Sequence, residues 1–144
     1  MIAHLHPFFV HFPVALYSTA LIIEIFRLFK KNIPDYFSII LVCIGAIMGM
    51  LSGLSGDLAS KNVESIPGIA KALENHAAAG NLMVWFGLIS GFFLVFLHLK
   101  KKSNDLLRWI VLIILFFSVI TTAFLGSELV YDFGAGTMLT KQPK

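Results

Sequence analysis

Charged residues are scarce in this sequence. Asp, Glu, Lys and Arg make up only 13% of its 144 residues, whereas 58% of the residues are apolar. An ordinary soluble domain is about 25% charged and about 45–50% apolar. So little charge cannot cover a globule of this size with polar groups, which excludes a typical soluble enzyme, a disordered chain and a fibrous protein. The composition places the chain in a lipid bilayer, and the length allows one domain.

Cysteine is nearly absent as well. The single cysteine, Cys43, lies in an apolar run, so the sequence offers no intrachain disulfide and no CxxC motif. We interpret Cys43 as a small buried apolar side chain. Basic residues are also missing ahead of the first apolar run, and no A-x-A site follows it. We therefore expect no cleavable secretory signal and a first helix that is retained.

The apolar residues fall into four long runs. A helix needs about 20 mostly apolar residues to cross a bilayer, and runs of that length cover residues 7–29, 36–58, 76–99 and 106–129. Backbone groups inside a bilayer must be hydrogen-bonded within the protein, which favours helices over an open sheet. The sequence predicts one all-α membrane domain over residues 1–144, an up-and-down bundle of four transmembrane helices.

The loop between the second and third runs, residues 60–75, holds a further helical signal. Pro67 begins a stretch with an amphipathic pattern, and proline is tolerated in a first helical turn because its missing N–H would have no partner there. We predict a short helix over residues 67–74. It either lies on the membrane surface or extends the third transmembrane helix.

Most positive charges gather in two clusters, one between the first two helices and one between the last two. The clusters are Arg27, Lys30 and Lys31, and Lys100, Lys101, Lys102 and Arg108. By the positive-inside rule both clusters face the cytoplasm, so both chain ends and the loop 60–75 face outward. The net charge of +3 is explained by this orientation and does not indicate a nucleic-acid partner.

Four of the five histidines fall at the outward end: His4, His6, His11 and His76. Ionisable groups at membrane depth are costly, so such a cluster indicates a functional site. The alternative is that these side chains are interfacial and hydrated by headgroups, an interpretation that we favour for His4. The first and third helices lie diagonally opposite in an up-and-down bundle, so His11 and His76 can face each other across its interior. Two neutral imidazoles in this arrangement suit a haem iron as axial ligands.

His6 is the alternative to His11. At about 1.5 Å per residue, His6 matches His76 in depth better than His11 does, although it lies at or before the first turn. We rank His11 and His76 as the ligands and keep His6 in reserve. The same histidines could instead hold a zinc or copper ion, which needs further ligands. Asp57, Glu128 and His6 are the candidates for these.

Glycines form stripes on the second and third helices. Close packing of the small-xxx-small kind explains such stripes and is our preferred interpretation of the glycines taken alone. The alternative is that they leave room for a flat cofactor beside the histidines. The glycines assigned to that role are Gly49, Gly53, Gly80 and Gly87.

Polar residues at the cytoplasmic end have simpler interpretations. Glu24 lies one helical turn from Arg27, so an ion pair is expected there. His98 is alone at this end, and a second haem held by two histidines is therefore not expected.

Three segments carry a resemblance to a known family: LHPFFVHFPVAL (Leu5–Leu16), ENHAAAGN (Glu74–Asn81) and GSELVYDFGAGT (Gly126–Thr137). Together they resemble a bacterial family of small four-helix predicted membrane proteins of unknown function. Its pattern has an HPxxVHFP start, a glycine-rich second helix, a histidine that opens the third helix and an LVYxxGxG end. The resemblance covers nearly the whole chain. Ser127 and Glu128 stand where the family often shows a second glycine, a departure at the turn before Leu129.

The resemblance implies a location and a kind of chemistry. Family members occur with, or fused to, c-type cytochrome modules, which implies electron transfer at the outer face of the bacterial inner membrane. On matching positions the family's histidines correspond to His6, His11 and His76, and its closing motif to Glu128, Tyr131, Gly134 and Gly136. No CxxCH motif occurs, so the chain cannot itself attach a c-type haem covalently.

We therefore predict a membrane electron-transfer component that binds haem b through His11 and His76. Tyr131 or Asp132 would contact a haem propionate or a quinol. Electrons would pass between the quinone pool and a c-type cytochrome or another respiratory subunit, in a homo- or hetero-oligomer. The alternative is a structural or anchor subunit without a cofactor, whose polar rim docks a partner. An outer-face metal site ranks last because no motif such as HExxH occurs, and enzymatic activity is left open.

Overall fold

The structure is a computed structural model that describes residues 5–30 and 32–137. The helices in this part of the chain are α1 (His6–Phe9), α2 (His11–Phe29), α3 (Tyr36–Ser60), α4 (Ala70–Leu99) and α5 (Asp105–Tyr131). The backbone stays helical at Val10 (φ −63°, ψ −25°), so α1 and α2 form one rod over His6–Phe29. No strand occurs among the described residues. The predicted all-α fold is confirmed.

Among the residues that the structure describes, four helical segments are long and apolar enough to cross a membrane: His6–Phe29, Tyr36–Ser60, Ala70–Leu99 and Asp105–Tyr131. Many of their large apolar side chains point outward; Leu82, Phe92 and Phe124 are 73%, 77% and 71% exposed. Exposed apolar surface on this scale is unfavourable in water and is satisfied by lipid. The chain is a multi-pass membrane protein.

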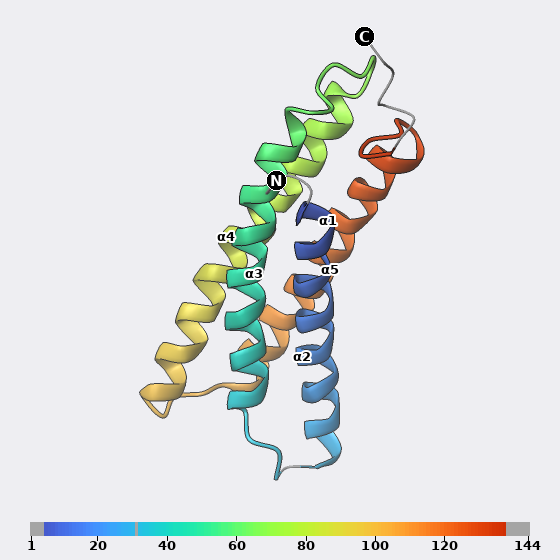
Figure 1. Ribbon diagram of the computed structural model, residues 1–144. Helices are drawn as coiled ribbons and strands as arrows, with labels where there is room; N and C mark the ends of the chain where they lie inside the picture. Colours follow the sequence, from blue (N-terminus) through green and yellow to red (C-terminus); the bar gives the residue numbers. More distant parts are fainter. Residues whose placement is uncertain (1–4, 31, 138–144) are drawn as a thin grey trace.

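The four spans run up and down and close into a bundle in which each packs against two neighbours (Figure 1). Helix α3 contacts α2 and α4, and α5 contacts α4 and α2. The two short turns lie at one end, next to Lys30 and Lys100, which we call the basic end. His6 and His76 lie toward the other, the histidine end. Which end faces outward stays a prediction.

Helix α4 is longer than the sequence predicts because it begins at Ala70. The expected short helix over 67–74 is therefore not separate: its last residues form the first turns of α4, the second of the two alternatives. Ile69 and Ala72 pack against Leu129 of α5 in a small apolar cluster at the histidine end. This cluster ties the 60–75 loop to the end of the last helix.

The main core surrounds Tyr17, which is fully buried. Its ring fills the space beside two glycines of the predicted stripes. A Cβ at Gly45 would lie 2.5 Å from Tyr17 Cε1, and a Cβ at Gly87 would overlap the Tyr17 hydroxyl. The hydroxyl has no hydrogen-bond partner among the described residues. Gly45 and Gly87 thus serve close packing around one large side chain.

The basic end is joined by a buried polar network. Glu24 and Arg108 are each 1% exposed, and the Glu24 carboxylate accepts hydrogen bonds from Arg108 Nε (2.8 Å) and Ser38 Oγ (2.5 Å). The expected pair with Arg27 is present at 3.4 Å. The sequence placed Arg108 in a cytoplasmic charge cluster, but its partner Glu24 holds it inside the bundle. Buried charges need such partners because losing their water is costly.

Asp35 extends this network to His98 of α4. Its carboxylate lies 3.4 Å from Arg108 Nη1 and 3.2 Å from His98 Nδ1, and it accepts a hydrogen bond of 2.5 Å from Ser103 Oγ. Burial alone would raise the pKa of Asp35. The hydrogen bonds from Ser103 and His98 and the positive charges of His98 and Arg108 outweigh burial and lower this pKa below its ordinary value.

Candidate functional site

Two histidines meet across the bundle at the histidine end. His6 begins α1 and His76 lies in the second turn of α4; their ring centroids are 6.3 Å apart and their planes make an angle of 79°. Both side chains are half-buried. The structure therefore brings together two residues that are 70 positions apart in the sequence.

The His6 imidazole is held at one nitrogen. Its Nδ1 lies 3.0 Å from the carbonyl oxygen of Ser52 and 3.3 Å from Ser55 Oγ. A carbonyl oxygen only accepts hydrogen bonds, so Nδ1 carries the hydrogen. The Ser55 hydroxyl donates its own hydrogen to the Ser52 carbonyl at 2.9 Å and thus also acts as an acceptor for His6. The lone pair of a neutral His6 then lies on Nε2.

The His76 imidazole is held in the same way. Its Nδ1 lies 3.1 Å from the carbonyl oxygen of Thr122, which again fixes the hydrogen on Nδ1. No hydrogen bond to Nε2 of either histidine is found within residues 5–30 and 32–137. Each ring therefore has one nitrogen bound to the protein and one free.

A glycine lies beneath each ring. A Cβ at Gly56 would come within 3.0 Å of His6 Cε1, and a Cβ at Gly126 would come within 3.0 Å of His76 Cε1. In a helix the carbonyl of one residue lies beside the residue four positions later, and these glycines follow Ser52 and Thr122 by four. The missing side chain lets each ring approach the carbonyl that accepts its hydrogen bond.

Sequence reasoning missed the residues that hold the two rings. They are Ser52, Ser55, Gly56, Thr122 and Gly126. The available signal was the string S-x-x-x-G in the second apolar run and T-x-x-x-G in the fourth. Each string offers a small polar residue and, one turn later, an absent side chain.

His11, ranked first with His76 in the sequence analysis, lies elsewhere. Its side chain is exposed, and its Nδ1 is bonded to the carbonyl of Pro7 one turn earlier. Five residues along a helix correspond to a rotation of about 140°, which turns His11 away from the face that carries His6. The reserve residue, His6, thus occupies the place opposite His76. His4 lies outside the described residues.

The four predicted cofactor glycines have ordinary packing partners. A Cβ at Gly49 would meet Met83 Sδ at 3.6 Å, and one at Gly53 would meet Val84 Cγ2 at 3.8 Å. Gly80 faces Thr122 Cγ2 at 3.8 Å and so lies next to the His76 acceptor. Gly87 makes room for Tyr17. Of the four, Gly80 is the one in contact with a residue that holds the histidine pair.

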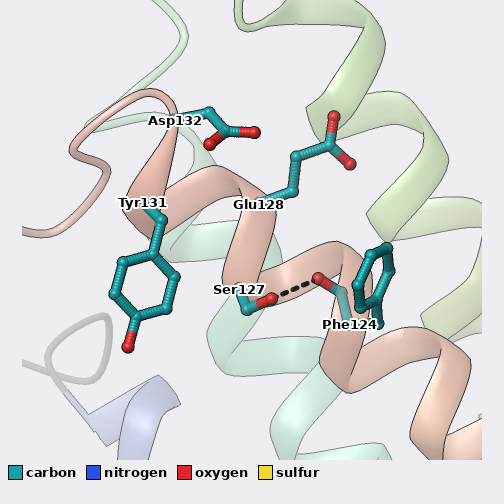
Figure 2. A pocket seen from close by; sticks show the side chains of 5 residues that line it. All are labelled: Phe124, Ser127, Glu128, Tyr131 and Asp132. Carbon is teal, nitrogen blue, oxygen red and sulfur yellow. Dashed lines mark hydrogen bonds between the residues drawn. The ribbon is translucent and has the colours of Figure 1, made fainter.

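Tyr131 and Asp132 line a surface pocket of about 290 Å³ at the end of α5, together with Phe124, Ser127 and Glu128 (Figure 2). Tyr131 is 85% exposed and points away from the two carboxylates. Ser127 Oγ donates to the Phe124 carbonyl at 2.7 Å. The pocket is formed by one helix and does not include either histidine of the pair.

The acids proposed as additional metal ligands are not assembled around the histidines. Within the described ranges, no group of three or more His, Cys, Asp and Glu side chains is placed to hold a metal ion. Asp57 is exposed, and Glu128 lines the α5 pocket. The site thus offers two nitrogen donors from the protein, His6 and His76.

Fold and site together define a four-span helical membrane protein with a histidine pair at one end. Residues 3–139 match the family described as Predicted membrane protein (DUF2231), and the chain belongs to this family. The predicted resemblance is confirmed. Searches of curated proteins and of solved structures found no match. The family description names no activity.

Proposed function

We propose that this protein is a membrane electron-transfer component that binds one haem b between His6 and His76. The observation that carries this proposal is the construction of the pair. Each imidazole donates its Nδ1 hydrogen to a helix carbonyl and keeps Nε2 free. Histidines that bind metals are usually oriented by such a bond from the other ring nitrogen, which fixes the tautomer.

The number of donors favours haem over a bare metal ion. A structural zinc site takes four ligands from the protein, whereas a haem iron receives four nitrogens from the macrocycle and needs only axial ligands from the chain. The spacing also fits. A metal–imidazole bond is about 2.0 Å long, so two rings that share one ion have centres about 6 Å apart. The centroids of His6 and His76 are 6.3 Å apart.

A bound haem would supply a one-electron redox centre at the histidine end. The chain's own residues orient the two imidazoles through the carbonyls of Ser52 and Thr122, so that in each neutral ring the lone pair lies on Nε2. We propose quinol as the electron donor within the bilayer, and a c-type cytochrome or another respiratory subunit as the acceptor at the histidine end. The resemblance to proteins found with c-type cytochromes supports these partners.

The proposed location is the bacterial inner membrane, with the histidine end outward. Lys30 and Lys100 lie at the two turns of the basic end, and the positive-inside rule assigns this end to the cytoplasm. The haem would then lie near the outer surface, where an exported cytochrome can reach it.

Haem titration of the purified, cofactor-free chain in detergent tests this proposal. We expect one haem per chain and a Soret band typical of two axial imidazoles. His6→Ala and His76→Ala should each weaken binding at least about 10-fold, the scale of losses at metal sites. His11→Ala and His98→Ala are matched controls and should bind as the unchanged chain does. A folded chain that does not bind haem would contradict the proposal and favour the structural-subunit alternative.

A further inference from the structure

The helices repeat after an offset of 70 residues. The rod His6–Phe29 corresponds to residues 76–99, which end together with α4, and α3 corresponds to residues 106–130 of α5. The turn between the first pair of helices corresponds to the turn between the second pair. The described helices thus form two hairpins that pass through the bundle in the same direction (Figure 1). Parallel repeats of this kind are related by an axis along the membrane normal.

The histidine site repeats with the same offset. His6 corresponds to His76, the Ser52 carbonyl to the Thr122 carbonyl, and Gly56 to Gly126. The contacts of these residues repeat as well as their positions in the sequence. Each histidine donates to the carbonyl of its own hairpin at 3.0 or 3.1 Å, and each would meet a Cβ at its glycine at 3.0 Å. Apart from the contact of His6 with Ser55 Oγ, the two hairpins hold their histidines in the same arrangement.

Two contacts mark the axis between the hairpins. In a two-fold arrangement, a residue touches its own counterpart only where both lie near the axis. His6 meets its counterpart His76, and Tyr17 meets its counterpart Gly87. His6 and Tyr17 are eleven residues apart, about three helical turns, and so lie on the same face of the first rod.

The second contact explains why the halves differ. A tyrosine at both positions would place two rings in one space, and a glycine at both would leave a hole. With Tyr17 opposite Gly87, a single ring fills the space on the axis. A fused pair of hairpins can combine a large residue with a small one in this way, whereas two identical subunits cannot.

We propose that the chain is a duplicated helical hairpin in which each half presents one histidine to a shared site on the axis. Gly56 and Gly126 are its positioning residues, since each lets one imidazole reach its carbonyl. The duplication stands on the contacts alone. That the shared ligand is haem rests on the proposed function.

Nitrogen NMR of the cofactor-free full chain in nanodiscs tests the equivalence without haem. With ¹⁵N-labelled histidine, assigned through single His→Gln variants, His6 and His76 should both show a protonated Nδ1 and an unprotonated Nε2. Gly56→Ala should shift the ring signals of His6 and leave those of His76 in place, and Gly126→Ala should do the reverse. Gly53→Ala is the control, because a Cβ there meets its nearest neighbour, Val84 Cγ2, only at 3.8 Å. Different tautomers for the two histidines, or a glycine variant without effect on its own ring, would overturn the inference.

A haem titration of the same variants separates the two proposals. We expect Gly56→Ala and Gly126→Ala to weaken haem binding by similar factors, about 10-fold each, and Gly53→Ala to change it less than about twofold. Equivalent histidine signals in a chain that does not bind haem would overturn the proposed function and support the duplication. Haem binding that responds to only one of the two glycines would support the function and overturn the equivalence of the halves.

Discussion

The two ends of the bundle hold polar groups in opposite ways. At the basic end, Glu24 and Arg108 bind each other inside the bundle, and neighbouring Ser38 and Asp35 complete the network. At the histidine end, each imidazole is bound at Nδ1 and free at Nε2. The basic end uses its polar atoms to join the helices, whereas the histidine end brings together two imidazoles, each with one ring nitrogen that has no partner within the described ranges. The basic end is thus a buried network built on ion pairs, where Arg27 Nε still lacks a hydrogen-bond partner within the described ranges, and the histidine end is a candidate binding site formed by two imidazoles.

Breaking the buried network at the basic end should have the largest effect on stability. Arg108→Ala leaves the buried Glu24 carboxylate without its closest charged partner, which costs about 3–5 kcal/mol for buried ion pairs. Unfolding of the detergent-solubilised chain would measure the loss. Lys102→Ala, at an exposed cation of the same end, is the control and should change stability by less than about 0.5 kcal/mol. Equal stabilities for the two variants would show that the network is not structural.

Filling the glycine beside Tyr17 should have an intermediate effect. Gly87→Ala puts a methyl group into the Tyr17 hydroxyl, and overpacking a core costs about 1–3 kcal/mol. Tyr17→Phe removes that hydroxyl, which has no partner within the described part of the chain, and should recover much of the loss when combined with Gly87→Ala. Unfolding of the single and double variants measures the recovery. Additive losses would mean that the hydroxyl and the methyl group do not collide.

Acid should weaken the basic end by a smaller amount. The pKa of Asp35 is lowered in the folded chain, so its contribution to stability is fully present above its ordinary pKa of 3.8 and is lost as the pH falls through the lowered value. Asp35→Asn should remove this part of the pH dependence. Unfolding measured between about pH 5 and pH 2, which spans the ordinary pKa of an aspartate and values below it, compares the two chains. Parallel curves for both would contradict the assigned role of Asp35.

The sequence predicted the fold well because each membrane span is a long, continuous apolar run, which can be recognised without knowledge of distant contacts. It placed the start of α4 too late because Lys71 and Glu74 interrupt the apolar pattern while the backbone remains helical. The burial of Arg108 could not be predicted in this way, since its partner Glu24 is 84 residues away. Local patterns record helices; they do not record which distant side chain meets which.

The histidine pair of the candidate site could be predicted only in part, because pairing also depends on distant contacts. The sequence located histidines at one end of the bundle and named His76, but it ranked His11 above His6. The depth of His6 along its helix already favoured a pairing with His76. Which histidine faces His76 also depends on the packing of α1 against α3, and in this packing His6 lies there. The stripe that includes Gly87 has a packing role because of Tyr17, 70 residues earlier. The role of Gly56 and Gly126 could not be predicted, because it depends on which histidine ring lies against each glycine in the folded chain.

The most direct test of haem binding at the histidine end is a reduced-minus-oxidised absorption spectrum. It is recorded on the chain purified from bacterial membranes that were supplied with haem precursors. We predict an α band and a Soret band typical of a haem with two imidazole ligands; both should be present in His11→Ala and absent from His6→Ala. A folded, purified chain without either band would contradict the central claim that the free nitrogens of His6 and His76 bind haem.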